Sequence, residues 1–370
     1  MKTREQYGKL SSIIGILANV VLFAAKFAVG TIFHSVAVIA DAANSLADAG
    51  SSVVSLISFK LSARPADEKH PFGHERIEYL ASSVVAVLIL LLGVELFKTS
   101  FEKILHPAEI EFSFVVMGVL LFSIAVKVWL YSFNSKWSRL LDSSMLKATA
   151  IDSLSDVLAT SAVLISIIIS PLLGFQLDGY MGLVVSGFII FSGISILKDT
   201  INSLLGEVPS DELVKQVTTF VAKHEGVQGM HDLVVHNYGP KRYFASVHVE
   251  VDAKKDILES HDFIDNIEQD ILQELGIELV IHMDPIIVDD PFVNELRELT
   301  DKIVVSVENS LSMHDFRVVK GYTHSNLLFD IVIPHQSSKS DEQIIREINE
   351  KIKEYDRSLN TVITIDRSYI

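Results

Sequence analysis

Six long apolar runs in the first 206 residues constrain the fold of this chain most. Each is close to the roughly 20 helical residues that are needed to cross the ~30 Å hydrocarbon core of a bilayer. The runs lie near residues 11–33, 36–62, 78–100, 113–134, 145–170 and 177–204. Residues 1–206 are therefore predicted to form a six-helix transmembrane transport domain, with the lipid bilayer as its main partner.

The distribution of Lys and Arg between the runs predicts the orientation of the spans. Bases gather before the first run and in the second-to-third and fourth-to-fifth connections: Lys2, Arg4, Lys9, Arg64, Lys69, Arg76, Lys136, Arg139 and Lys147. Cytoplasmic loops carry an excess of Lys and Arg. Both termini are therefore expected in the cytoplasm, in a multi-pass protein of the cell membrane.

Two of the runs carry oxygen-bearing side chains four residues apart, which places them on one helix face. Asn44 and Asp48 lie in the second run, and Asp152 and Asp156 lie in the fifth. A carboxylate at the bilayer centre costs roughly 2.5 to 3.5 kcal/mol on insertion scales. Three acids in hydrocarbon need a compensating charge, so the pattern predicts a divalent-cation site. The alternative, polar helix–helix contacts, explains Asn44 well and the three acids poorly.

Other polar residues in the runs are open to more than one interpretation. Asp41 lies on nearly the same face as Asp48, and it either binds metal in a second conformation or lines the pathway. Lys26 and Lys127 are within reach of snorkelling or of an internal acid, so structural roles are favoured for both.

Residues 207–370 differ sharply from the first half in charge. Residues 1–206 hold 16 acidic and 15 basic residues, whereas residues 207–370 hold 31 and 16, a net charge of −15. This acidity disfavours binding to nucleic acid or to anionic lipid. The chain has no Cys, which excludes disulfides and thiolate metal sites. No phosphate-binding Gly-Lys-Ser/Thr loop is present, so neither a nucleotide nor an organic cofactor is expected.

Alternating strands and amphipathic helices in residues 207–290 predict a small ferredoxin-like α+β module in the order αββαβ. Residues 291–370 repeat it, since Met230-His-Asp recurs 83 residues later as Met313-His-Asp. Val280-Ile-His-Met-Asp284 likewise recurs as Val362-Ile-Thr-Ile-Asp366. The second copy has Asp330 in place of His248 and Thr364 in place of His282. A metal site is expected to be degraded there, leaving a structural or interfacial role.

Ligand-type residues also gather in two places outside the spans. The loop after the second run has three at close spacing, Asp67, His70 and His74, which fit a metal site and ordinary loop polarity equally. The first module has five at the ends of predicted elements: His231, His248, His261, His282 and Asp284. Imidazole with carboxylate suits Zn²⁺, Mn²⁺ or Fe²⁺, and surface histidines are the alternative. Ordinary surface positions are expected for His224, His314, His324 and His335.

Together these features resemble the cation diffusion facilitators over residues 8–288. The resemblance is carried by six spans, the two four-residue spacings, the loop Pro65-Ala-Asp-Glu-Lys-His-Pro-Phe-Gly-His74 and the start His231-Asp-Leu. It implies a homodimeric, proton-coupled exporter of divalent metals. Its intramembrane site maps onto Asn44, Asp48, Asp152 and Asp156, its loop site onto Asp67, His70 and His74, and its cytoplasmic sites onto the five module residues. The extra module, residues 291–370, departs from the family's usual plan.

The quartet in the spans favours manganese as the transported metal. Asn and three Asp form an all-oxygen set, which harder ions such as Mn²⁺ prefer, and the quartet also resembles the manganese branch of the family. Zinc, iron and cobalt remain open, because Zn²⁺ binds most such sites more tightly than Mn²⁺. Metal release would leave repelling carboxylates that take up protons, so antiport by alternating access is expected.

Two other classes of protein remain compatible with the sequence. A non-transporting membrane metal sensor and a cation channel would both need buried acids and cytoplasmic histidines. An enzyme is disfavoured, because no nucleophile–base pair stands out in the chain.

Overall fold

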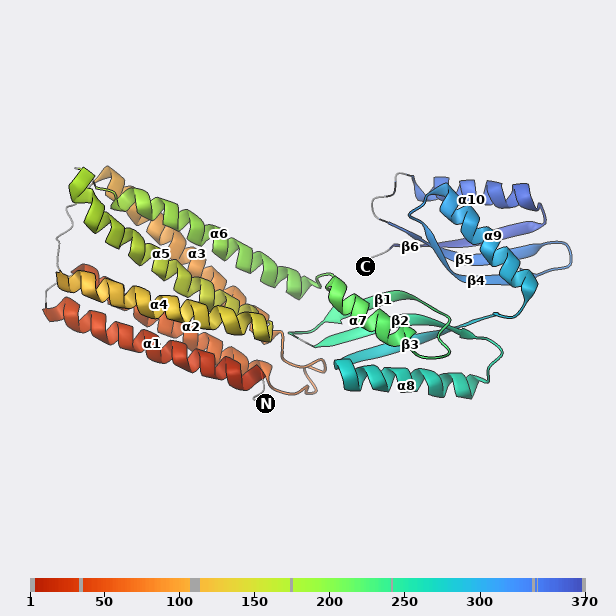
Figure 1. Cartoon of the computed structure of the whole chain (residues 1–370), viewed down its shortest axis with the longest axis horizontal. Helices are drawn as coiled ribbons and strands as arrows, with labels where there is room; N and C mark the ends of the chain where they lie inside the picture. The colour runs from red at the N-terminus through yellow and green to blue at the C-terminus, as the bar shows by residue number, and fades with distance from the viewer. Residues whose placement is uncertain are drawn as a thin grey trace. The chain divides into compact units, whose positions relative to one another are not determined.

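The computed structural model describes residues 4–32, 36–106, 114–173, 176–240, 242–334, 337 and 339–367. The chain divides into two compact units, a helical unit of residues 1–207 with 238–241 and an α+β unit of residues 208–237 with 242–370. Figure 1 labels the helices and strands of each unit, and each unit is described by itself.

In the part of the chain that the structure describes, the helical unit consists of six long helices. Their bounds are α1 Arg4–Ile32, α2 Val36–Ser62, α3 Ile77–Leu105, α4 Phe114–Leu141, α5 Ser144–Leu173 and α6 Asp178–Leu205. A chain in lipid must satisfy its own backbone hydrogen bonds, and helices do so within one segment. Within the described residues, five of the six are long and apolar enough to span a membrane. The sixth, α2, carries Asp41, Asp48 and Lys60 within its length.

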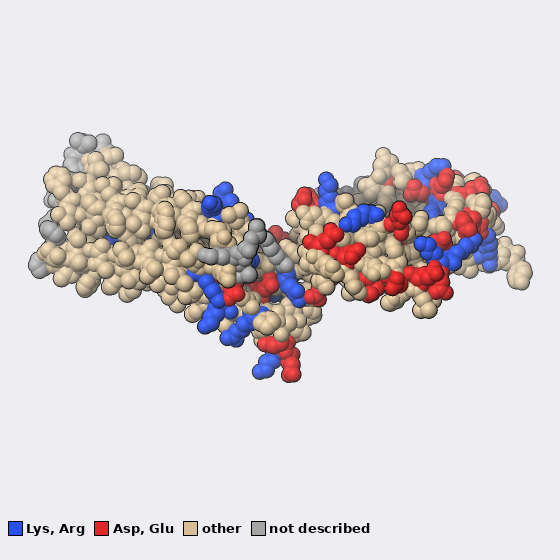
Figure 2. Space-filling model, turned by 60° about the horizontal axis from the view of Figure 1, so that its bottom comes forward, with Lys and Arg blue, Asp and Glu red and all other residues tan. Residues whose placement is uncertain are grey.

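The helices pack mainly in the pairs α1 with α2, α3 with α6 and α4 with α5. Small residues allow these close approaches, as is common between membrane helices. A Cβ atom at Gly8 of α1 would lie 2.4 Å from the ring of Phe59 on α2. Large apolar side chains such as Leu91 and Phe191 are exposed, and Figure 2 shows a nearly uncharged surface over most of this unit. Such a surface suits contact with lipid.

A buried carboxylate ties one end of the helical unit together. Glu78 of α3 is fully buried and forms an ion pair with Arg4 of α1 at 2.7 Å. The hydroxyl of Ser143, between α4 and α5, donates a hydrogen bond to Glu78 at 2.5 Å. The guanidinium of Arg4 also donates to the carbonyl oxygen of Leu141 at 2.9 Å. Three helical segments distant in the sequence are therefore connected through one acid.

Glu78→Ala is expected to destabilise the helical unit by on the order of 3 kcal/mol, since truncating one partner leaves the other charge and a hydroxyl unsatisfied. The thermal unfolding midpoint of the purified protein in detergent measures the effect. Glu102→Ala, at an exposed acid of the same helix, is the matched control. Equal midpoints for the two variants would contradict a stabilising role for Glu78.

The α+β unit begins with a three-stranded sheet and two helices. The elements are α7 Asp211–Ala222, β1 Gly229–Asn237, β2 Tyr243–Asp252, α8 Ile257–Leu275 and β3 Ile277–Ile286. The strand order is β1-β2-β3, with β1 antiparallel and β3 parallel to β2. The side chains of Ser210 and Asp256 cap α7 and α8. The predicted αββαβ order is confirmed.

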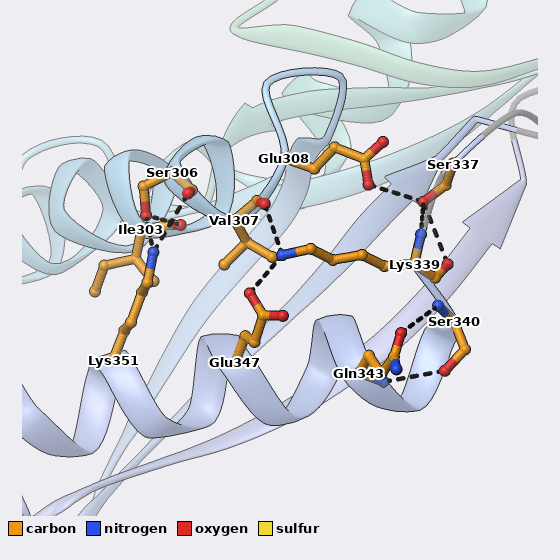
Figure 3. Close-up of polar contacts among 10 residues, drawn as sticks. All are labelled: Ile303, Ser306, Val307, Glu308, Ser337, Lys339, Ser340, Gln343, Glu347 and Lys351. Carbon is orange, nitrogen blue, oxygen red and sulfur yellow. Dashed lines mark hydrogen bonds and ion pairs between the residues drawn. The ribbon is translucent and has the colours of Figure 1, made fainter.

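The second module repeats this arrangement. Its elements are α9 Pro291–Val307, β4 Ser312–Lys320, β5 Ser325–Ile333, α10 Asp341–Tyr355 and β6 Leu359–Arg367. The strand order β4-β5-β6 and the pairing directions are the same as in the first. Figure 3 shows how its helices are joined: Lys339 contacts the carbonyl oxygen of Val307 at 3.1 Å and Glu347 at 2.5 Å. A capping box of Ser340 and Gln343 starts α10.

Strand alternation decides which residues each sheet leaves uncovered. In β2, Val247 and Val249 belong to the core formed with α7 and α8, and Ile281 of β3 does as well. Successive side chains of a strand point to opposite faces. His248 and His282 therefore lie on the face away from the helices, and in the second module the same holds for Asp330 and Thr364.

Both modules have a β-bulge at the same point of the first strand. The register shifts between His231 and Val234 in β1, and between His314 and Arg317 in β4. Asp232 and Asp315 there have φ values of 50° and 52°, in the left-handed region that Asp tolerates better than most residues. Bulges re-aim neighbouring side chains and are common next to functional sites. In both modules the bulge follows directly after a histidine.

Candidate metal centres

The two helices that carry the predicted intramembrane ligands meet at a lysine. The Nζ atom of Lys127 on α4 lies 2.7 Å from Oδ2 of Asp48 on α2 and 2.5 Å from Oδ2 of Asp156 on α5. The side chains of Lys127 and Asp48 are only 3% and 6% exposed. Carboxylates from two helices thus share one buried cation, and that cation is an ammonium group of the protein itself.

The other two members of the predicted quartet differ from each other. Asp152, one turn before Asp156, is buried and close enough to interact electrostatically with Asp156 and Lys127. Asn44, one turn before Asp48, is exposed. The structure thus brings the three acids together around Lys127, whereas Asn44 stays at the surface of the chain.

The net charge of this cluster follows from its composition. With all groups ionised, the carboxylates of Asp48, Asp152 and Asp156 and the ammonium group of Lys127 sum to −2. One divalent cation or two protons would neutralise the cluster. Because an uncompensated charge is costly in a low-dielectric site, one divalent cation and two protons are comparable ways to neutralise the cluster.

A second buried lysine, Lys26, forms an ion pair with Asp41. The Nζ atom of Lys26 on α1 lies 2.8 Å from Oδ2 of Asp41 and donates a hydrogen bond to the hydroxyl of Ser45 at 3.0 Å. Only 4% of the Lys26 side chain is exposed. This ion pair neutralises the charge of Asp41, which lies seven residues before Asp48 of the Lys127 cluster.

The predicted ligands of the loop after α2 lie together. The ligand atoms of Asp67, His70 and His74 lie within 4.8 Å of one another, with Nδ1 of His70 3.3 Å from Oδ1 of Asp67 and Nε2 of His74 3.4 Å from its Oδ2. The Nδ1 atom of His74 lies 3.1 Å from the carbonyl oxygen of Pro65. That contact leaves Nε2 of His74 for a metal. The backbone N–H of His70 lowers the pKa of Asp67, so its carboxylate stays ionised.

In the first module, three histidines form a row across the sheet. His231 pairs with His248 in register, and His248 pairs with His282. All three approach Asp284: Nδ1 of His248 at 2.8 Å, Nε2 of His231 at 3.3 Å and Nε2 of His282 at 3.3 Å. Burial and the neighbouring His314 lower the pKa of His231, which favours the neutral imidazole that binds metal. His261 is exposed on α8 and lies outside this row.

The chain matches two family models in succession. A model described as cation efflux transmembrane domain matches residues 12–205, which is more than half of the chain. A model described as cation efflux protein, cytoplasmic domain, matches residues 209–286. The chain belongs to the cation diffusion facilitator family. This family assignment makes it a multi-pass membrane protein of the cation efflux transporters.

Relatives of this cation diffusion facilitator cover most of its length. It is 28% identical over 285 residues to the cation-efflux pump FieF of Klebsiella pneumoniae, a match spanning 76% of this chain and 95% of that protein. The FieF protein of Salmonella newport matches equally. An uncharacterized transporter of Methanocaldococcus jannaschii is 29% identical over 250 residues, 68% of this chain and 88% of the relative.

Two of the histidines expected at ordinary surface positions are mostly covered, and the contact between His231 and His314 was not predicted. Nine-tenths of the His314 side chain is covered, with 10% exposed, because it stacks on His231 at 4.1 Å between ring centroids. His224 is also mostly covered, at 19%, whereas His324 is exposed as expected and His335 lies outside the described residues. The repeat of His231 as His314 was the signal that could have placed His314 in a site.

Proposed function

We propose that this cation diffusion facilitator exports divalent transition-metal cations from the cytoplasm in exchange for protons, with Mn²⁺ as the favoured cargo. The observation that supports this is the convergence of Asp48 and Asp156 on one buried cation, the ammonium group of Lys127. Acids of two separate helices already share a cation position here. A metal ion needs such a position between elements that can move.

The proposed cycle follows from the charge of the cluster. A metal ion enters from the cytoplasm past the Asp67 loop and displaces Lys127 from the two carboxylates. With a divalent ion bound, the three acids and Lys127 sum to zero, which lowers the cost of burying the loaded site. After release on the other side, protons take the place of the metal. Alternating access with either load then gives antiport without a nucleotide.

The donor set supports Mn²⁺ over Zn²⁺. Carboxylate and amide oxygens suit harder ions, whereas imidazole favours Zn²⁺ and its tetrahedral geometry. The site holds three acids on α2 and α5, the amide of Asn44 lies one turn before Asp48, and none of these four positions is a histidine. Export of Zn²⁺, Fe²⁺ or Co²⁺ is the alternative within the family.

Asn44→His is expected to shift the transport preference towards Zn²⁺, by about tenfold in the ratio of Zn²⁺ to Mn²⁺ rates, because it adds an imidazole one turn from Asp48. Metal-by-metal uptake into proteoliposomes measures the ratio. Asn202→His, on α6, controls for a new histidine elsewhere in a span. An unchanged metal profile would contradict the selectivity argument for Asn44.

We also propose a role for each of the three segments of the chain. We assign residues 1–206 to transport, residues 207–290 to metal binding and dimerisation, and residues 291–370 to a second copy of that module. We place the protein in the cell membrane as a homodimer with both termini in the cytoplasm. In that arrangement the cytoplasmic modules can bind metal and shift the conformational equilibrium of the two transmembrane domains. Lys and Arg gather at one end of the helical unit (Figure 2), as expected of a cytoplasmic end.

Metal addition to sealed proteoliposomes with a pH indicator inside tests the proposed function. An antiporter moves protons against the metal flow, and the proton flux stops when the metal gradient is removed. A channel would give metal current without proton counterflow. A sensor would give neither, and either of these results would overturn the proposal.

A further inference from the structure

The second module carries its own group of ligand-type side chains at the place of the histidine row. His314 pairs in register with Asp330, and Asp330 pairs with Thr364, which are the positions of His231, His248 and His282. Asp366 corresponds to Asp284 of the first module. The ligand atoms of His314, Asp330 and Asp366 lie within 4.8 Å of one another, and Nε2 of His314 is 3.3 Å from Oδ2 of Asp366.

The burial of His314 is an independent observation that points to a ligand. Nine-tenths of its side chain is buried, yet within the described residues neither ring nitrogen makes a hydrogen bond. A buried polar group without a hydrogen bond destabilises the folded protein. An ion held between Nε2 and the carboxylates would remove that cost, because the nitrogen already faces Asp366.

The first module contributes to the same place. The ring of His231 stacks on His314 with 26° between the ring planes, and Oδ1 of Asp232 lies 4.0 Å from Nε2 of His314. The backbone N–H of Asp315 donates a hydrogen bond to Glu250 of β2 at 3.4 Å. The two modules thus meet where both bulges and both histidines lie, and Asp232 can supply a further oxygen.

We propose that His314, Asp330 and Asp366 bind a second regulatory divalent cation, with Asp232 of the first module completing the site. One imidazole and three carboxylates form a harder donor set than the three histidines and one acid of the first module. The two sites therefore differ in preference, the first for Zn²⁺-like ions and the second for Mn²⁺-like ions. The repeat is a second metal site of altered chemistry, and not a degraded copy. This inference is independent of which ion the helical unit transports.

Mn²⁺ titration of the purified full-length protein in detergent tests the site, with free Mn²⁺ followed by electron paramagnetic resonance. His314→Ala and Asp366→Asn are each expected to bind one Mn²⁺ fewer per chain, or to weaken one site by at least about tenfold. His324→Ala and Asp301→Asn, at exposed positions of the same module, are the matched controls. Site variants that bind as many Mn²⁺ ions, as tightly, as the controls would overturn the proposal.

A variant that adds a ligand tests the site even where a variant that removes a ligand, such as His314→Ala, unfolds. Asp330→His restores the histidine of the first module, and it is expected to raise the Zn²⁺ over Mn²⁺ preference of one site by at least about tenfold. An unchanged preference, with the metal-free unfolding midpoint retained, would overturn the proposal. These readouts are binding measurements, so their failure is distinguishable from absent proton counterflow in vesicles, which would overturn the transport function.

Discussion

Asp48→Asn is expected to reduce metal-dependent proton flux in proteoliposomes by at least about 100-fold, equivalent to ~2.7 kcal/mol in the barrier. The substitution keeps the size of the side chain but removes one of two carboxylates that converge on Lys127. The cluster then carries −1, so a divalent ion leaves it with an uncompensated positive charge in a buried site. Binding and release would both be impaired.

Asp199→Asn is the matched control for this result. Asp199 also lies on a membrane helix, α6, but is 54% exposed and pairs with Lys147 at 2.8 Å. Neutralising it is expected to leave proton flux within about twofold of wild type, as for most exposed ion pairs. Undiminished flux in Asp48→Asn would remove the α2–α5 cluster from the transport pathway.

Lys127→Met is expected to tighten metal binding at the intramembrane site by at least about tenfold, or ~1.4 kcal/mol, while slowing turnover by a similar factor. Met replaces the aliphatic part of the side chain without its charge, so a metal ion no longer competes with an ammonium group for Asp48 and Asp156. The same tightness slows release, because no internal cation replaces the departing metal. Equilibrium metal binding and single-turnover efflux measure the two effects separately.

Lys26→Met is the control that separates competition between Lys127 and the metal from a general structural effect of losing a buried lysine. Lys26 is as buried as Lys127 and pairs with Asp41, so its loss should leave the affinity of the Lys127 cluster nearly unchanged. Lys127→Arg, which keeps the charge, should not tighten metal binding. Weaker metal binding in Lys127→Met would contradict the role of Lys127 as an internal competitor.

The sequence by itself determined the architecture and singled out the acids of the candidate site. Run lengths near that of a bilayer predicted the helices, because only helices satisfy the backbone in lipid. Asp48 and Asp156 stood out because an acid in an apolar run is costly. The 83-residue repeat predicted two modules, and the structure shows two sheets of the same order. These inferences needed only local periodicity and the cost of burial, which act along the chain.

Only the tertiary structure decided which residues meet across helices and strands. The sequence left Lys127 within reach of either the membrane surface or an internal acid, and packing of α4 against α5 directs it to Asp48 and Asp156. His314 reads as a surface residue, and the bulge after it with the stacked His231 buries it. His261 fits the histidine set by type, yet α8 holds it outside the row. Contacts between distant elements depend on register and packing, which spacing along one chain does not encode locally.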